Sequence, residues 1–220
     1  MNFFKSIKFD KITKRVASEI SSMFKILVPD LTNPSLANMY DITIYKHQLK
    51  FLKFLLAYDK LFLLKSKQIG GTTISLLYVL YLCKTLTNRN IIIHSPNIVM
   101  TKKILLSLLA NENNVDFSPI GIDLLEYNSY ITFIEDSEIK AYSQLIAQYE
   151  NAIFVFDDFN ENQLMLIDLL PIFKSNNKVV IISNTPMNGN GNQIWSNKIG
   201  VKFQTLLLST FKIKFKKNKK

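Results

Sequence analysis

Four short segments of the sequence are apolar over most or all of their length, and each runs directly into polar residues. They are Leu61–Leu64, Ile91–His94, Ile153–Phe156 and Val179–Ile182. Segments with the helical spacing of apolar residues stand before and between them. Strands that are apolar throughout and alternate with helices are typical of a parallel sheet with helices on both faces. Because ligands bind at the carboxyl ends of such strands, we expect the functional residues directly after these segments.

The remaining elements are predicted from the periodicity of the apolar residues. Helical spacing predicts helices over Ile44–Tyr58, Thr72–Leu86 and about Val99–Leu109, and the second of them is apolar nearly all round, which predicts a buried helix. The segments Tyr130–Ile134 and Glu138–Tyr142, separated by a short acidic stretch, predict a β-hairpin. The fold class that we expect is α/β, with three layers, a mainly parallel central sheet and a β-hairpin excursion.

The two ends of the chain differ from this central part. Met1–Ile20 interleaves lysines with large apolar residues and predicts an amphipathic helix. Such a helix can lie on a membrane or on a partner, but we expect it to pack on its own domain. The polar stretch Pro29–Asn38 predicts a loop. We therefore divide the chain into an N-terminal helical segment and linker (1–38), one main domain (39–210) and a basic tail (211–220).

Positive charge is the main compositional feature of the chain. The formal net charge is +10, and only Arg15 and Arg89 are arginines, so lysine supplies nearly all the positive charge. Lysine suits attraction to phosphates rather than the reading of bases. A polyanion bound without sequence preference is therefore the first partner to consider, and an acidic protein is the second. A coding bias toward lysine is the alternative explanation.

The basic tail alternates Phe211, Ile213 and Phe215 with lysines. This period predicts a last edge strand, and the alternative is a basic arm that contacts nucleic acid.

Composition excludes several classes of protein. Hydrophobic residues make up 48% of the chain, which is typical of a globular rather than a disordered protein. Cys83 is the single cysteine and lies in an apolar run, which predicts a buried thiol in a reducing compartment. Cys83, His47 and His94 are too far apart in the sequence for the spacing of a zinc site. The longest uncharged apolar stretch, Thr72–Cys83, is too short to span a bilayer, which needs about 20 residues.

The residues after the first apolar segment, Lys65–Thr73, stand where a phosphate-binding loop leads from a strand to a helix. The usual pattern of such loops is G-x-x-x-x-G-K-[ST]. Here Lys65 stands at the position of the first glycine, and Gly71 stands at that of the lysine. Gly70 and Gly71 still allow the backbone to approach a phosphate, and Thr72 offers a hydroxyl to magnesium. A plain Gly-Gly turn into a helix is the alternative.

Two adjacent carboxylates, Asp157 and Asp158, follow the apolar segment Ile153–Phe156. In phosphoryl-transfer ATPases a first carboxylate holds magnesium, while a second positions or deprotonates the attacking water. A strand-end turn with helix-capping acids is the alternative.

Two further segments carry polar side chains beside this predicted site. Ser183–Trp195 follows the last apolar segment and is rich in neutral hydrogen-bonding side chains. It fits a group that senses the γ-phosphate of a nucleotide, and an Asn/Gly loop without a role is the alternative. Tyr45–Gln48 precedes the first apolar segment, and the amide of Gln48 is suited to reading adenine by paired hydrogen bonds. A solvated helix start is the alternative there.

These segments together resemble the ATPase domain of large terminase subunits, the DNA-packaging motors of tailed bacteriophages. Tyr45–Gln48 matches the family's adenine-reading segment, Lys65–Thr73 its variant phosphate loop of the type K-S-R-Q-x-G-x-[ST], and Asp157–Asp158 its Asp-Glu pair. Ser183–Trp195 is similar to its coupling motif, S-T-P-N-G-x-x-N-x-[FY], and the predicted hairpin over Tyr130–Tyr142 to its β-excursion. The resemblance covers the chain from about residue 42 to residue 195.

The resemblance implies a P-loop NTPase fold of the RecA/ASCE type, which hydrolyses ATP with Mg²⁺ through Walker A and Walker B motifs. It implies translocation of double-stranded DNA into a procapsid, with the portal, the small terminase subunit and further copies in a ring as partners. It also implies a virus-encoded protein of the infected host's cytoplasm that is neither secreted nor bound to a membrane.

The site residues that the resemblance implies fall into four groups. The nucleotide-binding residues are Tyr45, Gln48, Lys65, Ser66, Lys67, Gln68, Gly70, Gly71, Thr72 and Thr73. The catalytic residues are Lys65, Lys67 and Asp158, the magnesium ligands are Thr72 and Asp157, and the coupling residues are Ser183, Asn184, Thr185 and Pro186.

Several positions depart from the family pattern. Lys67 stands where the family usually has arginine, so the charge is kept but the bidentate fork is lost. Asp158 replaces the catalytic glutamate and is one methylene shorter, so we expect slow hydrolysis, with Glu161 as a reserve base. Met187 adds a residue to the coupling motif.

Two functions other than a DNA-translocating ATPase stay open from the sequence. One is a nucleotide-binding adaptor to DNA or a portal that hydrolyses weakly or not at all, and the other is a helicase-like ATPase. The sequence ends shortly after the coupling segment, so we expect no nuclease activity from this chain. An excised domain, a split-gene product and a degenerate relative are all compatible with this length.

Overall fold

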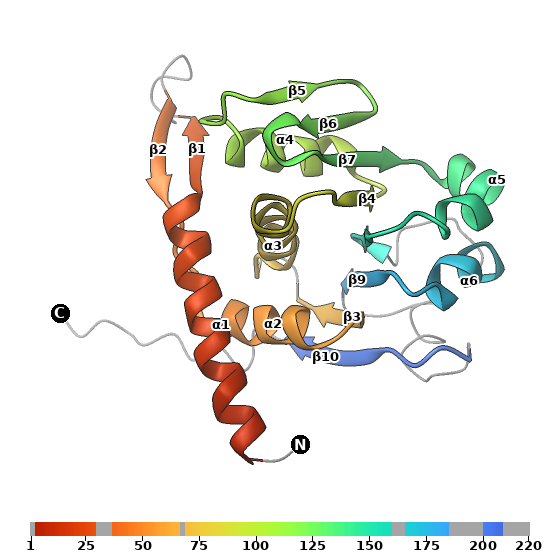
Figure 1. Cartoon of the computed structure of the whole chain (residues 1–220), viewed down its shortest axis with the longest axis horizontal. Helices are drawn as coiled ribbons and strands as arrows, with labels where there is room; N and C mark the ends of the chain where they lie inside the picture. The colour runs from red at the N-terminus through yellow and green to blue at the C-terminus, as the bar shows by residue number, and fades with distance from the viewer. Residues whose placement is uncertain (1–2, 30–36, 67–68, 160–165, 185–199, 209–220) are drawn as a thin grey trace.

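The chain forms a mixed sheet with helices on both of its faces (Figure 1). The computed structural model describes residues 3–29, 37–66, 69–159, 166–184 and 200–208. The main sheet has eight strands in the order β10-β3-β9-β8-β4-β7-β6-β5. The strands are β3 (Lys60–Lys65), β4 (Asn90–His94), β5 (Val115–Phe117), β6 (Gly121–Leu124), β7 (Ser129–Ile134), β8 (Ala152–Phe156), β9 (Lys178–Asn184) and β10 (Gln204–Leu208).

Pairing in this sheet is parallel from β10 across to β7 and antiparallel where β7, β6 and β5 meet. The helices are α1 (Phe3–Met23), α2 (Lys46–Ala57), α3 (Gly71–Thr85), α4 (Ile98–Leu108), α5 (Asp136–Ile146) and α6 (Leu166–Lys174), with a 3₁₀ turn at Leu125–Tyr127. The expected α/β class with a mainly parallel sheet is confirmed. The four apolar segments form β3, β4, β8 and β9, and the three predicted helices form α2, α3 and α4.

The two faces of the sheet bury separate hydrophobic clusters. In β3, Leu61 and Leu63 belong to the cluster that includes residues of α1 to α4, whereas Phe62 and Leu64 belong to the cluster that includes residues of α5 and α6. The same alternation holds in β8 and β9. Successive side chains of a strand point to opposite faces, so a strand covered on both faces must be apolar at every position. This is the reason for the uninterrupted apolar segments of the sequence.

The N-terminal segment packs on the main body, as the amphipathic pattern predicted. Val16, Ala17 and Ile20 of α1 are buried in the same cluster as α2 and α3, and the Tyr81 hydroxyl donates to Glu19 Oε2 at 2.6 Å. The predicted loop Pro29–Asn38 is bounded by strands that the sequence did not indicate. They are β1 (Lys25–Pro29) and β2 (Ala37–Asp41), which pair antiparallel beside the main sheet (Figure 1). The division at residue 38 therefore falls inside β2.

The predicted hairpin over Tyr130–Ile134 and Glu138–Tyr142 is wrong in its second half. The first segment forms β7, but Glu138–Tyr142 lies within helix α5. The side chain of Glu138 accepts a hydrogen bond of 2.8 Å from the backbone N–H of Glu135, which starts the helix with a capping box. Acidic residues also suit the positive end of a helix dipole. The antiparallel strands of the main sheet lie instead before β7, in β5 and β6.

The C-terminal part of the described chain adds β10 at one edge of the sheet, parallel to β3. The sequence analysis did not predict this strand. The edge strand or basic arm that it predicted over residues 211–220 lies outside the described residues, as does the division at residue 210. Among the described residues, none of the helices combines the length and the apolar character needed to cross a lipid bilayer.

Candidate functional site

The candidate site lies at the carboxyl edge of three neighbouring parallel strands. In the sheet β9 lies between β3 and β8, and Lys65 of β3 is in register with Asn184 of β9. Asp157 and Asp158 follow directly after β8 on the other side of β9. Because parallel strands end at the same edge, residues that are far apart in the sequence come together there.

Asn184 links the lysine of the loop to one of the two carboxylates. The Lys65 Nζ donates to Asn184 Oδ1 at 2.8 Å, and Asn184 Nδ2 donates to Asp158 Oδ1 at 2.6 Å. The two partners fix the orientation of the amide, because an ammonium only donates and a carboxylate only accepts. Lys65 is only 6% exposed, so its charge is held inside the site. Sequence reasoning expected Asn184 in this region but not its bridging position.

The position of Lys65 explains why the lysine and the glycine of the loop are exchanged. A Cβ placed on Gly71 would lie 2.6 Å from Lys65 Cδ and 3.0 Å from Cε, so the lysine chain runs through the space that a side chain at 71 would need. The end of β3 thus brings a lysine side chain beside the start of α3. A side chain at position 71 would therefore displace the Lys65 side chain from its present path.

The loop enters α3 through a left-handed residue. Gly70 has a φ of +75° and precedes the first residue of α3. The backbone conformation favours glycine there, and a Cβ would also meet the end of the Gln48 side chain. Within the described part of the chain no side chain caps the N-terminus of α3, and the first turn of the helix contains no acidic residue. The free N–H groups of such a helix end attract anions.

Thr72 and Asp157 form the second pair of the site. The Thr72 hydroxyl lies 2.9 Å from each carboxylate oxygen of Asp157, which is only 4% exposed. Burial, together with the neighbouring charge of Asp158, raises the pKa of Asp157 from 3.8 to about 6, while Thr72 and Lys65 act in the opposite direction. A buried carboxylate with a costly charge beside a hydroxyl fits a magnesium ion, which prefers hard oxygen ligands.

Asp158 sits in an unusual backbone conformation. Its φ is +49°, in the left-handed region that residues with a Cβ rarely adopt. The bond from Asn184 to its carboxylate holds the side chain in the site. Backbone strain of this kind gathers at functional sites because the surroundings there determine the conformation.

The segment expected to read adenine lies at the N-terminus of α2, next to the loop. Gln48 Oε1 accepts from the backbone N–H of Tyr45 at 2.9 Å, while Tyr45 itself is 60% exposed. His47, which the sequence analysis did not assign to the site, has its Nε2 at 3.0 Å from the carbonyl oxygen of Ile69. Its place between two expected site residues was the one sequence signal that could have identified it.

The remaining predicted residues divide into two groups. Ser66 is half-buried, Thr73 is half-buried in α3, and Ser183 is fully buried at the end of β9. The others lie outside the described residues; they are Lys67, Gln68, Glu161, Thr185, Pro186 and Met187.

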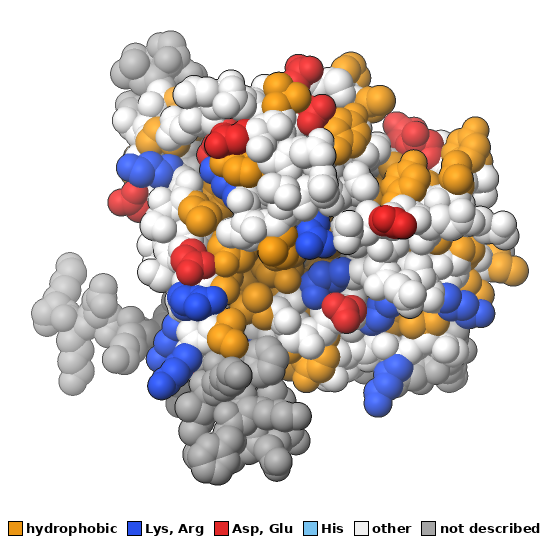
Figure 2. Space-filling model, in the orientation of Figure 1, with side chains coloured by type: hydrophobic (Ala, Val, Ile, Leu, Met, Phe, Trp, Pro, Cys, Tyr) orange, Lys and Arg blue, Asp and Glu red, His pale blue; other side chains and the backbone are white. Residues whose placement is uncertain are grey.

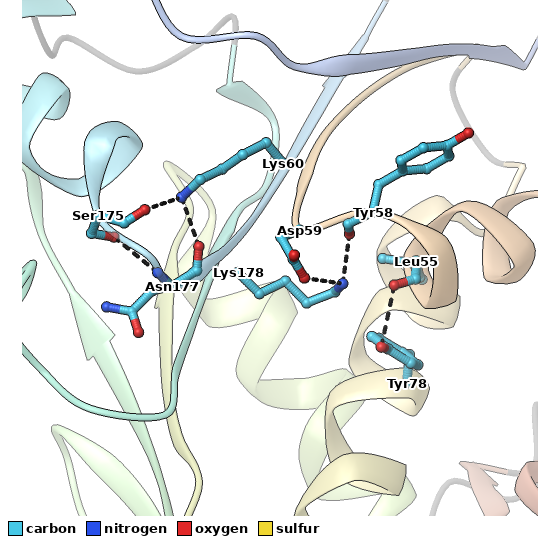
Figure 3. A network of polar contacts seen from close by, with 8 residues as sticks. All are labelled: Leu55, Tyr58, Asp59, Lys60, Tyr78, Ser175, Asn177 and Lys178. Atoms are coloured by element: carbon cyan, nitrogen blue, oxygen red, sulfur yellow. Dashed lines mark hydrogen bonds and ion pairs between the residues drawn. The ribbon is translucent and has the colours of Figure 1, made fainter.

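A different polar network closes the opposite, amino edge of the sheet (Figure 3). Lys60 Nζ donates to the carbonyl oxygens of Ser175 and Asn177 at 2.8 and 2.6 Å, and Lys178 Nζ donates to that of Tyr58 at 2.6 Å. Burial lowers the pKa of Lys60 to about 8. These two lysines connect the segments that follow α2 and α6. Their ammonium groups are therefore engaged within the protein and stabilise the fold.

A cavity of about 910 Å³ lies beside this network, between the ends of α3, α5 and α6. Figures 1 and 2 look at the molecule nearly along α3. Figure 2 shows hydrophobic side chains gathered in the middle of this face, with lysine or arginine side chains next to them.

Comparison with known proteins finds similarity at the level of structure. No protein-family model matches the sequence, and no curated protein matches it either. The chain is similar to a large terminase from a thermophilic bacteriophage, with a TM-score of 0.55 and 15% identity over 76% of this chain and 46% of the terminase. The same terminase in complex with ADP gives a TM-score of 0.52 and 16% identity over 75% of this chain and 45% of that one. In complex with ATP-γ-S it gives 0.55 and 15% over 75% and 44%.

The chain thus spans less than half the length of the terminase that it matches. Over three quarters of its own length, it has the α/β fold of part of a large terminase.

Proposed function

We propose that this chain is a magnesium-dependent ATPase, the nucleotide-hydrolysing domain of a viral large terminase that moves double-stranded DNA into a procapsid. The observation that carries the proposal is the set of three contacts at one sheet edge, Lys65–Asn184, Asn184–Asp158 and Thr72–Asp157. They unite a phosphate-binding cation, an uncapped helix end and two carboxylates. The fold of a terminase that has been crystallised with ADP and with ATP-γ-S supports the same conclusion.

The residues of the loop bind the phosphates in this proposal. Lys65 and Lys67 supply positive charge, and the N–H groups at Gly70, Gly71 and the start of α3 supply hydrogen bonds. Ser66, Gln68 and Thr73 complete the loop, and Tyr45 and Gln48 contact the base. Lys65 is already buried and oriented by Asn184. Little reorganisation is then needed when a phosphate arrives, which is the property that makes such a charge effective.

Thr72 and Asp157 hold the magnesium ion, through the hydroxyl and carboxylate oxygens that already face each other. When bound, the ion neutralises the charge on the phosphate oxygens. Asp157 is then relieved of the cost of a buried, unneutralised carboxylate. The pKa of Asp157 is raised to about 6 but is still lower than 7, so the carboxylate is largely ionised at neutral pH.

Asp158 orients the attacking water and accepts its proton, and Asn184 holds the Asp158 carboxylate in place. Ser183, Asn184, Thr185 and Pro186 couple the state of the nucleotide to movement. Asn184 contacts both Lys65 and Asp158. A displacement of Lys65 toward a phosphate therefore shifts Asn184 and, with it, the Asp158 carboxylate. Through Asn184, phosphate binding is thereby linked to the position of the catalytic base, Asp158.

The proposed partners are double-stranded DNA, bound without sequence preference, and by likeness to a terminase the portal, the small terminase subunit and further copies of the chain in a ring. The net charge of +10, nearly all from lysine, supports binding to a polyanion.

The test is ATP hydrolysis by the purified chain with and without magnesium and with and without double-stranded DNA. We expect Lys65→Ala to lower turnover by at least about 100-fold, the usual effect of removing one preorganised charge. Lys140→Ala, which removes an exposed lysine of α5, should leave turnover unchanged. Equal turnover in Lys65→Ala and the parent chain would defeat the assignment. Nucleotide binding without turnover would instead favour a nucleotide-binding adaptor.

A further inference from the structure

The first turn of α2 lies against the last residues of the phosphate loop, and His47 makes the contact. His47 Nε2 lies 3.0 Å from the carbonyl oxygen of Ile69, although the two residues are 22 positions apart. A carbonyl oxygen accepts but cannot donate, so Nε2 carries the hydrogen and donates it. The bond therefore ties α2 to the backbone of the loop rather than to a side chain.

Two contacts and one close approach act on residues 69 and 70. The side chain of Ile69 is only 6% exposed and belongs to the hydrophobic cluster of α1 to α4. Its carbonyl oxygen is held by His47. Gly70 is flanked by the amide of Gln48, whose Nε2 lies 2.4 Å from the place where a Cβ would stand. Of the three, only the bond from His47 acts on the orientation of a peptide group.

The orientation of that peptide group decides where an N–H points. The carbonyl of Ile69 and the N–H of Gly70 belong to one planar peptide unit, in which they point in opposite directions. Holding the oxygen toward His47 therefore turns the N–H of Gly70 away from α2. Among the described residues this N–H has no hydrogen-bond partner. It stands directly before the uncapped N-terminus of α3, where an anion is favoured.

Because residue 70 is a glycine, another contact must hold the Ile69–Gly70 peptide group in its orientation. Its φ of +75° is one that glycine adopts as readily as the negative values. Glycine on one side of a peptide group therefore leaves the group free to rotate unless another contact holds it. The hydrogen bond from His47 is such a contact.

We propose that His47 is a positioning residue for phosphate binding, whose Nε2–H holds the Ile69 carbonyl and so keeps the Gly70 N–H directed to a nucleotide phosphate. This inference rests on the proposed function, because it needs a nucleotide at the loop. It assigns to His47 a part in phosphate binding that is separate from the contact with the base expected of Tyr45 and Gln48.

The experiment compares the binding of ADP and of adenosine to the parent chain and to His47 variants by calorimetry. His47→Phe keeps the ring and removes the donor, and we expect it to weaken ADP binding about tenfold, the loss of one hydrogen bond. Adenosine carries no phosphate, so its affinity should not change. His47→Gln places an amide N–H near the position of Nε2 and should restore ADP affinity to within about threefold of the parent.

His47→Asn serves as a second probe should the phenylalanine variant fail to fold, because its amide is too short to reach Ile69. Thermal unfolding of each variant separates a loss of fold from a loss of the donor. Equal ADP affinity in a folded His47→Phe or His47→Asn chain overturns the inference, as does an equal loss of ADP and adenosine binding. A parent chain that binds no ADP overturns the proposed function itself, and with it the role of His47.

Discussion

Asp157 is a residue whose charge is costly in the folded chain. It is almost fully buried beside Asp158, and burial raises its pKa from 3.8 to about 6. The folded state therefore holds the proton more tightly than the unfolded state. Stability from this group is greatest at low pH, falls as the pH rises from about 4 to about 6, and stays lower above that range. At 1.36 kcal/mol for each pKa unit, the cost at neutral pH is about 3 kcal/mol.

Replacing Asp157 by asparagine should remove this cost while keeping an oxygen for the Thr72 hydroxyl. We expect Asp157→Asn to be more stable than the parent chain by about 1–3 kcal/mol at pH 7. The difference should vanish toward pH 4. Urea unfolding at a series of pH values measures it, with the exposed Asp116→Asn as control. A variant as stable as the parent at pH 7 would mean that the Asp157 charge is not costly.

At this scale the sequence predicted which residues lie together at this sheet edge better than the contacts between them. Lys65, Thr72 and Asp157 could be named because each follows an apolar strand or starts a helix. The bridge of Asn184 could not, because it depends on β9 lying between β3 and β8. Strand order is a property of long-range pairing, and local patterns do not contain it.

Among the elements, α5 shows how a helix-capping signal outweighs a short alternation of apolar and polar residues. The sequence after β7 alternates apolar and polar residues for a few positions, which predicted a strand. The chain forms a helix there because Glu135 and Glu138 make a capping box, and because Ile139, Ser143 and Ile146 then share a buried face. Positions separated by four and then three residues lie on one side of a helix. A stretch of sequence long enough to include Ile139, Ser143 and Ile146 therefore indicates a helix.

The capping box should contribute measurably to stability. Glu138→Ala removes the acceptor for the Glu135 N–H and should cost about 0.5–1.5 kcal/mol, as the loss of other helix caps does. Glu138→Gln keeps an acceptor at the same distance and should cost less. Chemical denaturation measures both, with Lys140→Ala on the same helix as the control. If the alanine and glutamine variants were equally stable, the box would have no energetic role.

In the whole molecule, the N-terminal segment and the sheet share one core. Ile20 of α1 is fully buried with residues of α2 and α3, and β1 pairs with β2. A segment that is buried in this way cannot unfold without exposing the core of its neighbours. The division of the chain at residue 38 stays a prediction, and cooperativity of unfolding is the property that tests it.

We expect Ile20→Ala to lower the stability of the whole chain by about 2–5 kcal/mol, the range for truncating a buried large side chain. Unfolding followed by circular dichroism and by tyrosine fluorescence should still show a single transition. Lys14→Ala, at an exposed position of the same helix, should have little effect. Two separate transitions, or an unchanged midpoint for Ile20→Ala, would show that residues 1–38 form an independent unit.

The left-handed backbone at Asp158 gives a reason for the shorter acid at this position. Aspartate and asparagine tolerate that region better than longer residues, because their short polar side chains form local hydrogen bonds. In this conformation the carboxylate of Asp158 accepts a hydrogen bond of 2.6 Å from Asn184. Turn geometry and side-chain length are therefore matched at this point of the chain. Aspartate is thus an acid that this turn accommodates.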